Sequence, residues 1–93
     1  MTVSDKRTWT VEITIAEHEE KRRTYARAVL RTDARMSIRG EGRAARRPSD
    51  MEVAEIGDEL AAARALADLS HQLMTLSAED IAQVTQRPMH LTV

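Results

Sequence analysis

The chain contains no cysteine, and this absence excludes several kinds of chemistry. Without thiols there is no disulfide framework, no cysteine nucleophile and no cysteine-ligated zinc site. Aromatic residues are nearly missing too, because Trp9 and Tyr25 are the sole examples. A chain of 93 residues is also short enough that folding buries only about 60 to 65% of the surface of the unfolded form. We therefore expect a thin core of Leu, Ile, Val, Met and Ala packed closely together.

Long apolar runs are absent as well. Charged residues interrupt every apolar stretch among the first twenty positions, so the sequence predicts neither a signal peptide nor a membrane span. A cytoplasmic protein is the resulting expectation. The net charge of −1 hides an asymmetry, because residues 1–49 contain twelve basic and seven acidic residues, whereas residues 50–93 contain two basic and eight acidic ones. The sequence thus predicts a domain with one basic side and one acidic side.

Alternation of side chains predicts three strands in the first half. Residues 8–16 place Trp9, Val11, Ile13 and Ile15 on one face, with polar residues opposite. Residues 22–32 and 36–44 continue this period of two, after a polar connection at 17–21 that holds His18 and a turn at 32–35. The small residues of the second and third strands share a face, and we expect them to form a shallow floor for a closely packed helix: Ala26, Ala28, Gly40 and Gly42.

The second half predicts that helix. Ser49 and Glu52 match a capping box at its start, although Gly57 allows the regular helix to begin about two turns later. Apolar residues recur at helical spacing through the segment and predict an amphipathic stripe rich in leucine: Val53, Ile56, Leu60, Ala63, Leu66, Ala67, Leu69, Leu73 and Leu76. A second cap, Ser77 with Asp80, predicts a separate short helix that ends before Pro88.

These elements predict one α+β domain over residues 8–87, with flexible tails at 1–7 and 88–93. A three-stranded antiparallel sheet packs on one long C-terminal helix, followed by the short helix, in the order β-β-β-α-α. Residues 89–93 are the least determined segment, because they suit either a tail or an added strand.

The order of elements and several local motifs resemble a known family. They are the Ala-x-Ala-x-Leu of residues 26–30, the Gly-x-Gly of residues 40–42, and the helical segments 56–61, 63–66, 68–69 and 72–73. Together they are similar, over roughly residues 8–86, to a family of small actinobacterial proteins described as a domain of unknown function. The resemblance implies a fold like that of the double-stranded RNA-binding domain. It implies no activity and no catalytic residues.

One surface carries the functional hypotheses. Alternation gathers an aromatic residue and four arginines on the open face of the sheet: Tyr25, Arg27, Arg31, Arg39 and Arg43. Arginine binds phosphate and tyrosine stacks on bases, so this face suits a nucleic acid. Alternatively it is a solvated face in which Glu12 and Glu41 pair with neighbouring arginines. The long helix begins with acidic residues, which repel phosphate from the place where a double-stranded RNA-binding domain grips it.

No catalytic, cofactor-binding or metal-binding residue is predicted. Glu55, Asp58 and Glu59 share a helix face, as carboxylates of a first helical turn commonly do. His18, His71 and His90 have no spacing that brings them to one ion. The three-stranded sheet leaves unpaired edges and an uncovered face, which favours dimerisation. The leading hypothesis is therefore a non-enzymatic interaction module, a homodimer or a partner for another protein, and the alternative is a weak nucleic-acid binder.

Overall fold

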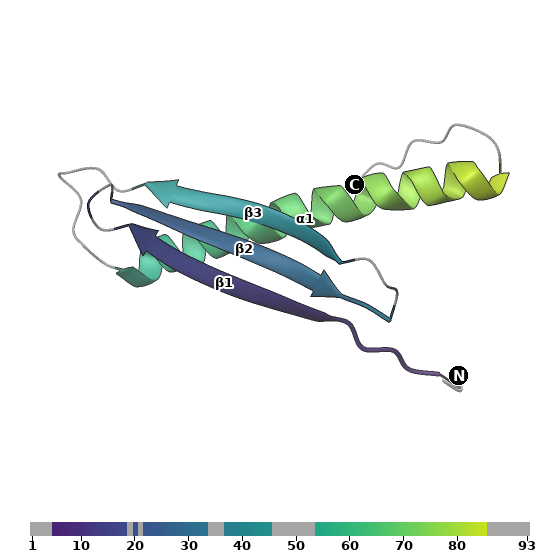
Figure 1. The fold of residues 1–93 in the computed structure, drawn as a ribbon, viewed down its shortest axis with the longest axis horizontal. Helices are drawn as coiled ribbons and strands as arrows, with labels where there is room; N and C mark the ends of the chain where they lie inside the picture. Colours follow the sequence, from purple (N-terminus) through teal and green to yellow (C-terminus); the bar gives the residue numbers. More distant parts are fainter. Residues whose placement is uncertain (1–4, 19, 21, 34–36, 46–53, 86–93) are drawn as a thin grey trace.

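Three antiparallel strands and one long helix form the fold (Figure 1). The computed structural model describes residues 5–18, 20, 22–33, 37–45 and 54–85. The elements are β1 (Thr10–His18), β2 (Arg23–Arg31), β3 (Ile38–Ala45) and α1 (Ala54–Thr85). The predicted α+β architecture is confirmed, and the strands lie in the order β1-β2-β3.

The register of the sheet fixes which residues share a face. Ala28 of β2 lies opposite Ile13 of β1 on one side and opposite Gly40 of β3 on the other. Residues directly opposite each other in an antiparallel pair point to the same face. The even-numbered residues of β2 and β3 therefore face α1 together with the odd-numbered residues of β1. Arg22, with φ of 51°, adopts the left-handed conformation at the turn that starts β2.

The helix packs against the sheet with almost no separation between the backbones. A Cβ atom added to Gly40 would lie 2.7 Å from Cα of Leu69, and one added to Gly42 would lie 2.7 Å from the carbonyl carbon of Arg64. Both glycines are thus required by close approach of the helix. The predicted floor of small residues is confirmed.

The helix surface that meets this floor differs from the predicted leucine stripe. Its buried line consists of Gly57, Ala61, Ala65 and Leu69, one turn apart. Ile56, by contrast, is 60% exposed. Gly57, Ala61 and Ala65 have no side chain larger than a methyl group, because the helix backbone lies close to the sheet along this line. Leu69 is the one residue of the predicted stripe that lies on it.

The prediction of a second short helix is wrong, because α1 continues without interruption to Thr85. Ser77 does not cap a helix; its hydroxyl donates a hydrogen bond of 2.9 Å to the carbonyl of Leu73 within the same helix. A serine inside a helix commonly bonds to the carbonyl four residues earlier in this way. The described helix, Ala54–Thr85, includes Gly57, and the capping box at Ser49 and Glu52 lies outside the described residues.

Strand boundaries also shift slightly from the prediction. β1 extends to His18, so this histidine belongs to the strand instead of the turn. The extension follows from pairing, since His18 lies opposite Arg23 at the end of the β1–β2 ladder. β3 begins at Ile38, and the predicted strand start at residue 36 lies outside the described residues, as do residues 88–93 of the predicted tail.

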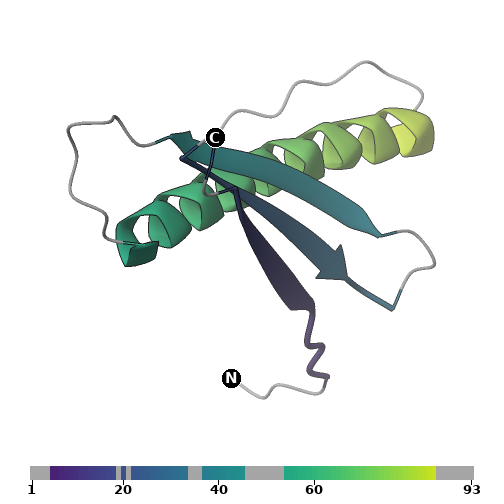
Figure 2. The ribbon, with the colours of Figure 1, turned by 60° about the vertical axis from the view of Figure 1, so that its left-hand side comes forward.

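The helix covers β2 and β3 and leaves β1 at the side (Figures 1 and 2). Its C-terminal half extends past the end of the sheet (Figure 1). Every residue of β1 is exposed, whereas β2 alternates between exposed or half-buried and buried positions. One helix is about 10 Å wide and strands lie about 4.8 Å apart. A single helix therefore covers two strands, and the third remains open.

Candidate interaction surfaces

The structure places all five predicted site residues on the face of the sheet opposite α1. Tyr25 lies beside Arg43, and Val29 lies beside Arg39, in the β2–β3 register. Arg27 and Arg31 lie on the same face of β2, since they alternate with the buried residues of that strand. We call this surface the open face. It carries the basic part of the sequence, while the acidic second half forms α1 on the other side.

Two of the arginines of the open face have acidic partners. Nη2 of Arg27 lies 3.5 Å from Oε1 of Glu41, and Nη2 of Arg31 lies 3.6 Å from Oε1 of Glu12. All four side chains are largely exposed, so each pair contributes little to stability. These pairs are the cross-strand contacts predicted for a solvated face, and they neutralise part of its charge.

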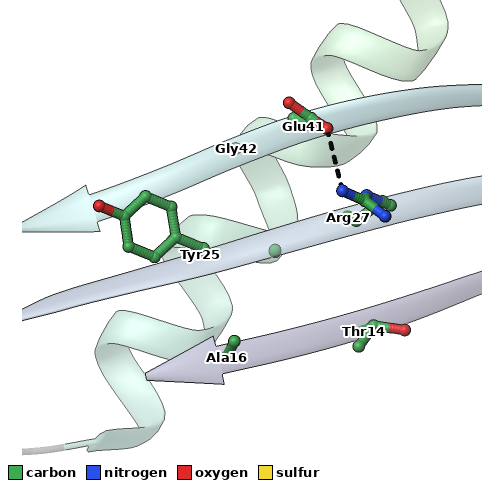
Figure 3. Close-up of a pocket in the computed structure, with 7 residues that line it drawn as sticks. Thr14, Ala16, Tyr25, Arg27, Glu41 and Gly42 are labelled. Carbon is green, nitrogen blue, oxygen red and sulfur yellow. Dashed lines mark ion pairs between the residues drawn. The ribbon is translucent and has the colours of Figure 1, made fainter. Parts of the chain in front are cut away.

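Tyr25 makes a ring contact on the open face and lines a hollow beside it. Its ring meets the ring of His18 edge to face, with centroids 5.3 Å apart and planes at 85°. Beside it lies a shallow hollow of about 390 Å³, whose lining includes Thr14, Ala16 and the ion pair of Arg27 with Glu41 (Figure 3). The hollow is open to solvent and combines a ring, a guanidinium and a carboxylate. Such a surface offers contacts to a partner but holds no buried reactive group.

A second surface lies on the opposite face of the sheet and consists of Val11, Ile13 and Ile15, which we call the β1 strip. These side chains are 39%, 37% and 42% exposed, although they lie opposite buried residues of β2 on the face that α1 covers elsewhere. The alternation of β1 identified them as an apolar face. It did not reveal that the helix leaves them uncovered.

Leu66 of α1 extends the apolar surface of the β1 strip. The helix directs Arg64 toward the outer edge of β3, where its guanidinium bonds to the carbonyl of Arg43 at 2.8 Å. Leu66 follows Arg64 by two residues, or about 200° around the helix axis. It therefore lies on the flank that faces β1, where it is 41% exposed. Sequence reasoning missed this combination, because it depends on the position of the helix across the sheet.

The two outer edges of the sheet differ in their hydrogen bonding. At β3, the backbone N–H of Glu41 donates to Oδ2 of Asp68 at 2.8 Å, and the carbonyl of Arg43 accepts from Arg64. Side chains of α1 thus occupy backbone groups that would otherwise bind a further strand. In the described part of the chain, no strand or helix lies along the outer edge of β1.

Comparison with known proteins identifies the family. A family model described as Rv2632c-like matches residues 7–90. The chain belongs to the Rv2632c-like family. The protein Rv2632c of Mycobacterium tuberculosis (strain ATCC 25618 / H37Rv) is 45% identical over 83 residues, which cover 89% of this chain and 86% of the relative. Protein Mb1767 of Mycobacterium bovis is likewise 45% identical over 83 residues, covering 89% and 85% of the two chains.

A solved structure of an Rv2632c-like protein has the same fold. The crystal structure of Rv2632c matches with a TM-score of 0.80 at 42% identity, and the match covers 94% of this chain and 100% of that one. The relatives are named as uncharacterized proteins, so the family supplies no activity. The predicted similarity to the double-stranded RNA-binding domain stays a prediction.

Among the residues that the structure describes, no three histidine or acidic side chains gather around a position where a metal ion could bind. Glu55, Asp58 and Glu59 lie on the first turns of α1, with Glu55 and Glu59 exposed. No helix in the described ranges is long and apolar enough to cross a membrane.

Proposed function

We propose that this chain is a non-enzymatic interaction module that associates with a second copy of itself through β1. The observation that supports the proposal is the β1 strip, an exposed apolar row on a strand whose outer edge carries no further strand among the described residues. An edge strand of this kind attracts another strand, because both its backbone groups and its side chains remain partly unsatisfied.

Burial of apolar side chains of the β1 strip would drive association. Complete burial of a valine or isoleucine side chain contributes about 1.5 to 3 kcal/mol. Because the strip is already more than half covered, each of its side chains offers on the order of 1 kcal/mol on dimerisation. Three side chains from each copy, together with new backbone hydrogen bonds, act against an association cost of about 4 to 15 kcal/mol.

Sedimentation equilibrium of two matched variants tests the proposal. Ile13→Asp places a charge in the strip, whereas Val84→Asp makes the same change at an apolar position of α1 that is 84% exposed. We expect the native chain and Val84→Asp to be dimeric and Ile13→Asp to be monomeric. Ile13→Thr, which keeps a β-branched side chain and the strand, is expected to weaken the dimer. A monomeric native chain, or a fully dimeric Ile13→Asp variant, contradicts the proposal.

A second candidate function is binding of single-stranded nucleic acid on the open face. Tyr25 beside Arg43 favours it. Arg43 has no acidic partner among the described residues, so its guanidinium can contact phosphate while the neighbouring ring stacks on a base. The candidate ranks second, since Arg27 and Arg31 already pair with glutamates and one ring is a small stacking surface.

Fluorescence anisotropy with a labelled oligothymidine tests this candidate. Binding through phosphates should weaken steeply as salt rises. The Tyr25→Ala/Arg43→Ala double variant should lose binding, while Lys6→Ala, which removes a positive charge outside the three strands, should bind almost normally. Absence of binding at low salt, or equal binding by the double variant, rules the candidate out.

A further inference from the structure

We infer that β1 pairs antiparallel with β1 of a second copy, with Ile13 opposite Ile13, so that two protomers form one continuous six-stranded sheet. The inference rests on the proposed self-association and specifies its geometry. It follows from three features of the described residues: the direction of the backbone groups in β1, the order of side chains along it, and the hydrogen bonds that side chains of α1 make to the β3 edge.

The backbone of β1 limits the possible pairings. In β3, Glu41 and Arg43 direct their N–H and carbonyl groups away from β2, toward Asp68 and Arg64. Along a strand, the N–H and carbonyl groups of successive residues point alternately to its two sides. Two residues directly opposite each other in an antiparallel pair point these groups either both toward each other or both away. Through the register of the sheet, the odd-numbered residues of β1 therefore direct their N–H and carbonyl groups to its outer edge.

The residues of β1 whose backbone groups point to the outer edge are also those whose side chains form the β1 strip: Val11, Ile13 and Ile15. A second β1 must consequently pair odd residues with odd residues in order to form hydrogen bonds. Such a pairing also places the two strips side by side on the same face of the extended sheet.

Three symmetric registers satisfy this condition near the middle of the strand, and charge distinguishes them. A register centred on Glu12 places two carboxylates directly opposite each other, which is unfavourable. A register centred on Thr14 places Val11 opposite the carboxylate of Glu17. With Ile13 at the centre, Val11 lies opposite Ile15 and Glu12 lies opposite Thr14. This register pairs every strip residue with an apolar residue and opposes no like charges.

The resulting dimer has a defined shape. A twofold axis through the Ile13 pair, perpendicular to the sheet, places both α1 helices on one side and both open faces on the other. The two strips then lie between the helices, flanked by Leu66 of each copy. Tyr25 and Arg43 occur twice on the joined open face.

Cysteine cross-linking measures the register directly, because the chain has no cysteine of its own. In the Ile13-centred register, two copies of Ile13→Cys have Cα atoms about 5.5 Å apart, a distance that a disulfide spans. Glu12→Cys of one copy lies about 4.5 Å from Thr14→Cys of the other, again within reach. Each of the latter two variants alone places its cysteines too far apart for a bond.

Mild oxidation followed by non-reducing electrophoresis gives the result. We expect Ile13→Cys to form a disulfide-linked dimer and the mixture of Glu12→Cys with Thr14→Cys to form the mixed dimer. Neither of these two variants should link to itself. A mixed dimer would exclude a dimer in which the two strips pack face to face, because residues 12 and 14 point to the face of the sheet opposite the β1 strip.

Other outcomes separate this inference from the proposed function. Self-linking of Glu12→Cys or Thr14→Cys overturns the register, although the chain still associates through β1. A native chain that sediments as a dimer while none of the cysteine variants links contradicts pairing through β1 and locates the interface elsewhere. A native chain that sediments as a monomer at all concentrations contradicts both the inference and the proposed function.

Discussion

Asp68 of α1 accepts a hydrogen bond of 2.8 Å from the backbone N–H of Glu41 in β3. The contact joins the middle of the helix to the outer edge of the sheet, and Nε2 of Gln72 donates to the other carboxylate oxygen at 3.4 Å. A hydrogen bond to an ionised acceptor is among the stronger ones in proteins. The position of the helix across the sheet therefore depends partly on this side chain.

Replacement of Asp68 should destabilise the fold and expose the Glu41 amide. For Asp68→Ala we expect a loss of about 1 to 2 kcal/mol in the free energy of unfolding, with faster hydrogen exchange at Glu41. Asp68→Asn keeps an acceptor oxygen and should recover part of the loss. Asp80→Ala removes the same charge from an exposed helix position and serves as the control. Unchanged exchange at Glu41 in Asp68→Ala would show that the bond is unimportant in solution.

Gly40→Ala should strongly destabilise the protein, because its Cβ would overlap the backbone of α1 at Leu69. Backbone atoms cannot move aside as a flexible side chain can, so we expect a cost of about 3 kcal/mol or more in urea unfolding. Gly57→Ala is the matched comparison, since its Cβ would meet the side chain of Thr24, with the hydroxyl at 3.1 Å, instead of backbone atoms. The gain in helix propensity, about 1 kcal/mol, should largely offset that contact. Equal effects of the two changes would contradict the described packing.

Ser77→Ala distinguishes one helix from two. In a continuous helix, alanine is the better residue, and stability should stay equal or rise by about 0.5 kcal/mol. Loss of a true helix cap would instead cost about 1 kcal/mol. Ser70→Ala, at an exposed position of the same helix, gives the reference change. Thermal unfolding followed by circular dichroism is the measurement.

The ion pair of Arg27 with Glu41 should contribute little to folding. Both side chains are largely exposed and their closest atoms lie 3.5 Å apart. Glu41→Gln retains the backbone N–H that bonds to Asp68 and should change the free energy of unfolding by less than about 1 kcal/mol, with the difference shrinking as salt rises. A larger, salt-independent loss would indicate that the pair has a structural role.

Much of the fold follows from local patterns in the sequence. Strict alternation predicted the three strands, and Gly40 with Gly42 predicted the close approach of the helix, because glycine inside a strand weakens it and often marks a place where another backbone comes near. The helix was divided wrongly at Ser77, since a serine followed three residues later by an acidic residue occurs both at helix starts and within helices. The exposed isoleucines of β1 could not be predicted. Alternation shows that residues share a face, whereas their burial depends on where a single helix lies across three strands.

The five residues of the open face were predicted from the same alternation, and the structure brings them together. Their role stays a prediction. The β1 strip was recognised as an apolar face, but its exposure was not predicted, and the positions of Arg64 and Asp68 beside the β3 edge have no signal in the sequence. These contacts arise only after the helix is docked, so local patterns do not contain them.

The hydrogen bonds between β3 and the side chains of Arg64 and Asp68 also affect how far an assembly of this protein can grow. A sheet whose two edge strands can both pair with further strands can add protomers at both edges and grow into a fibre. Here two backbone groups at the middle of the β3 edge already bond to side chains of the same molecule, so a strand added at this edge would have to displace them. We therefore expect the proposed dimer to stay a dimer as the protein is concentrated.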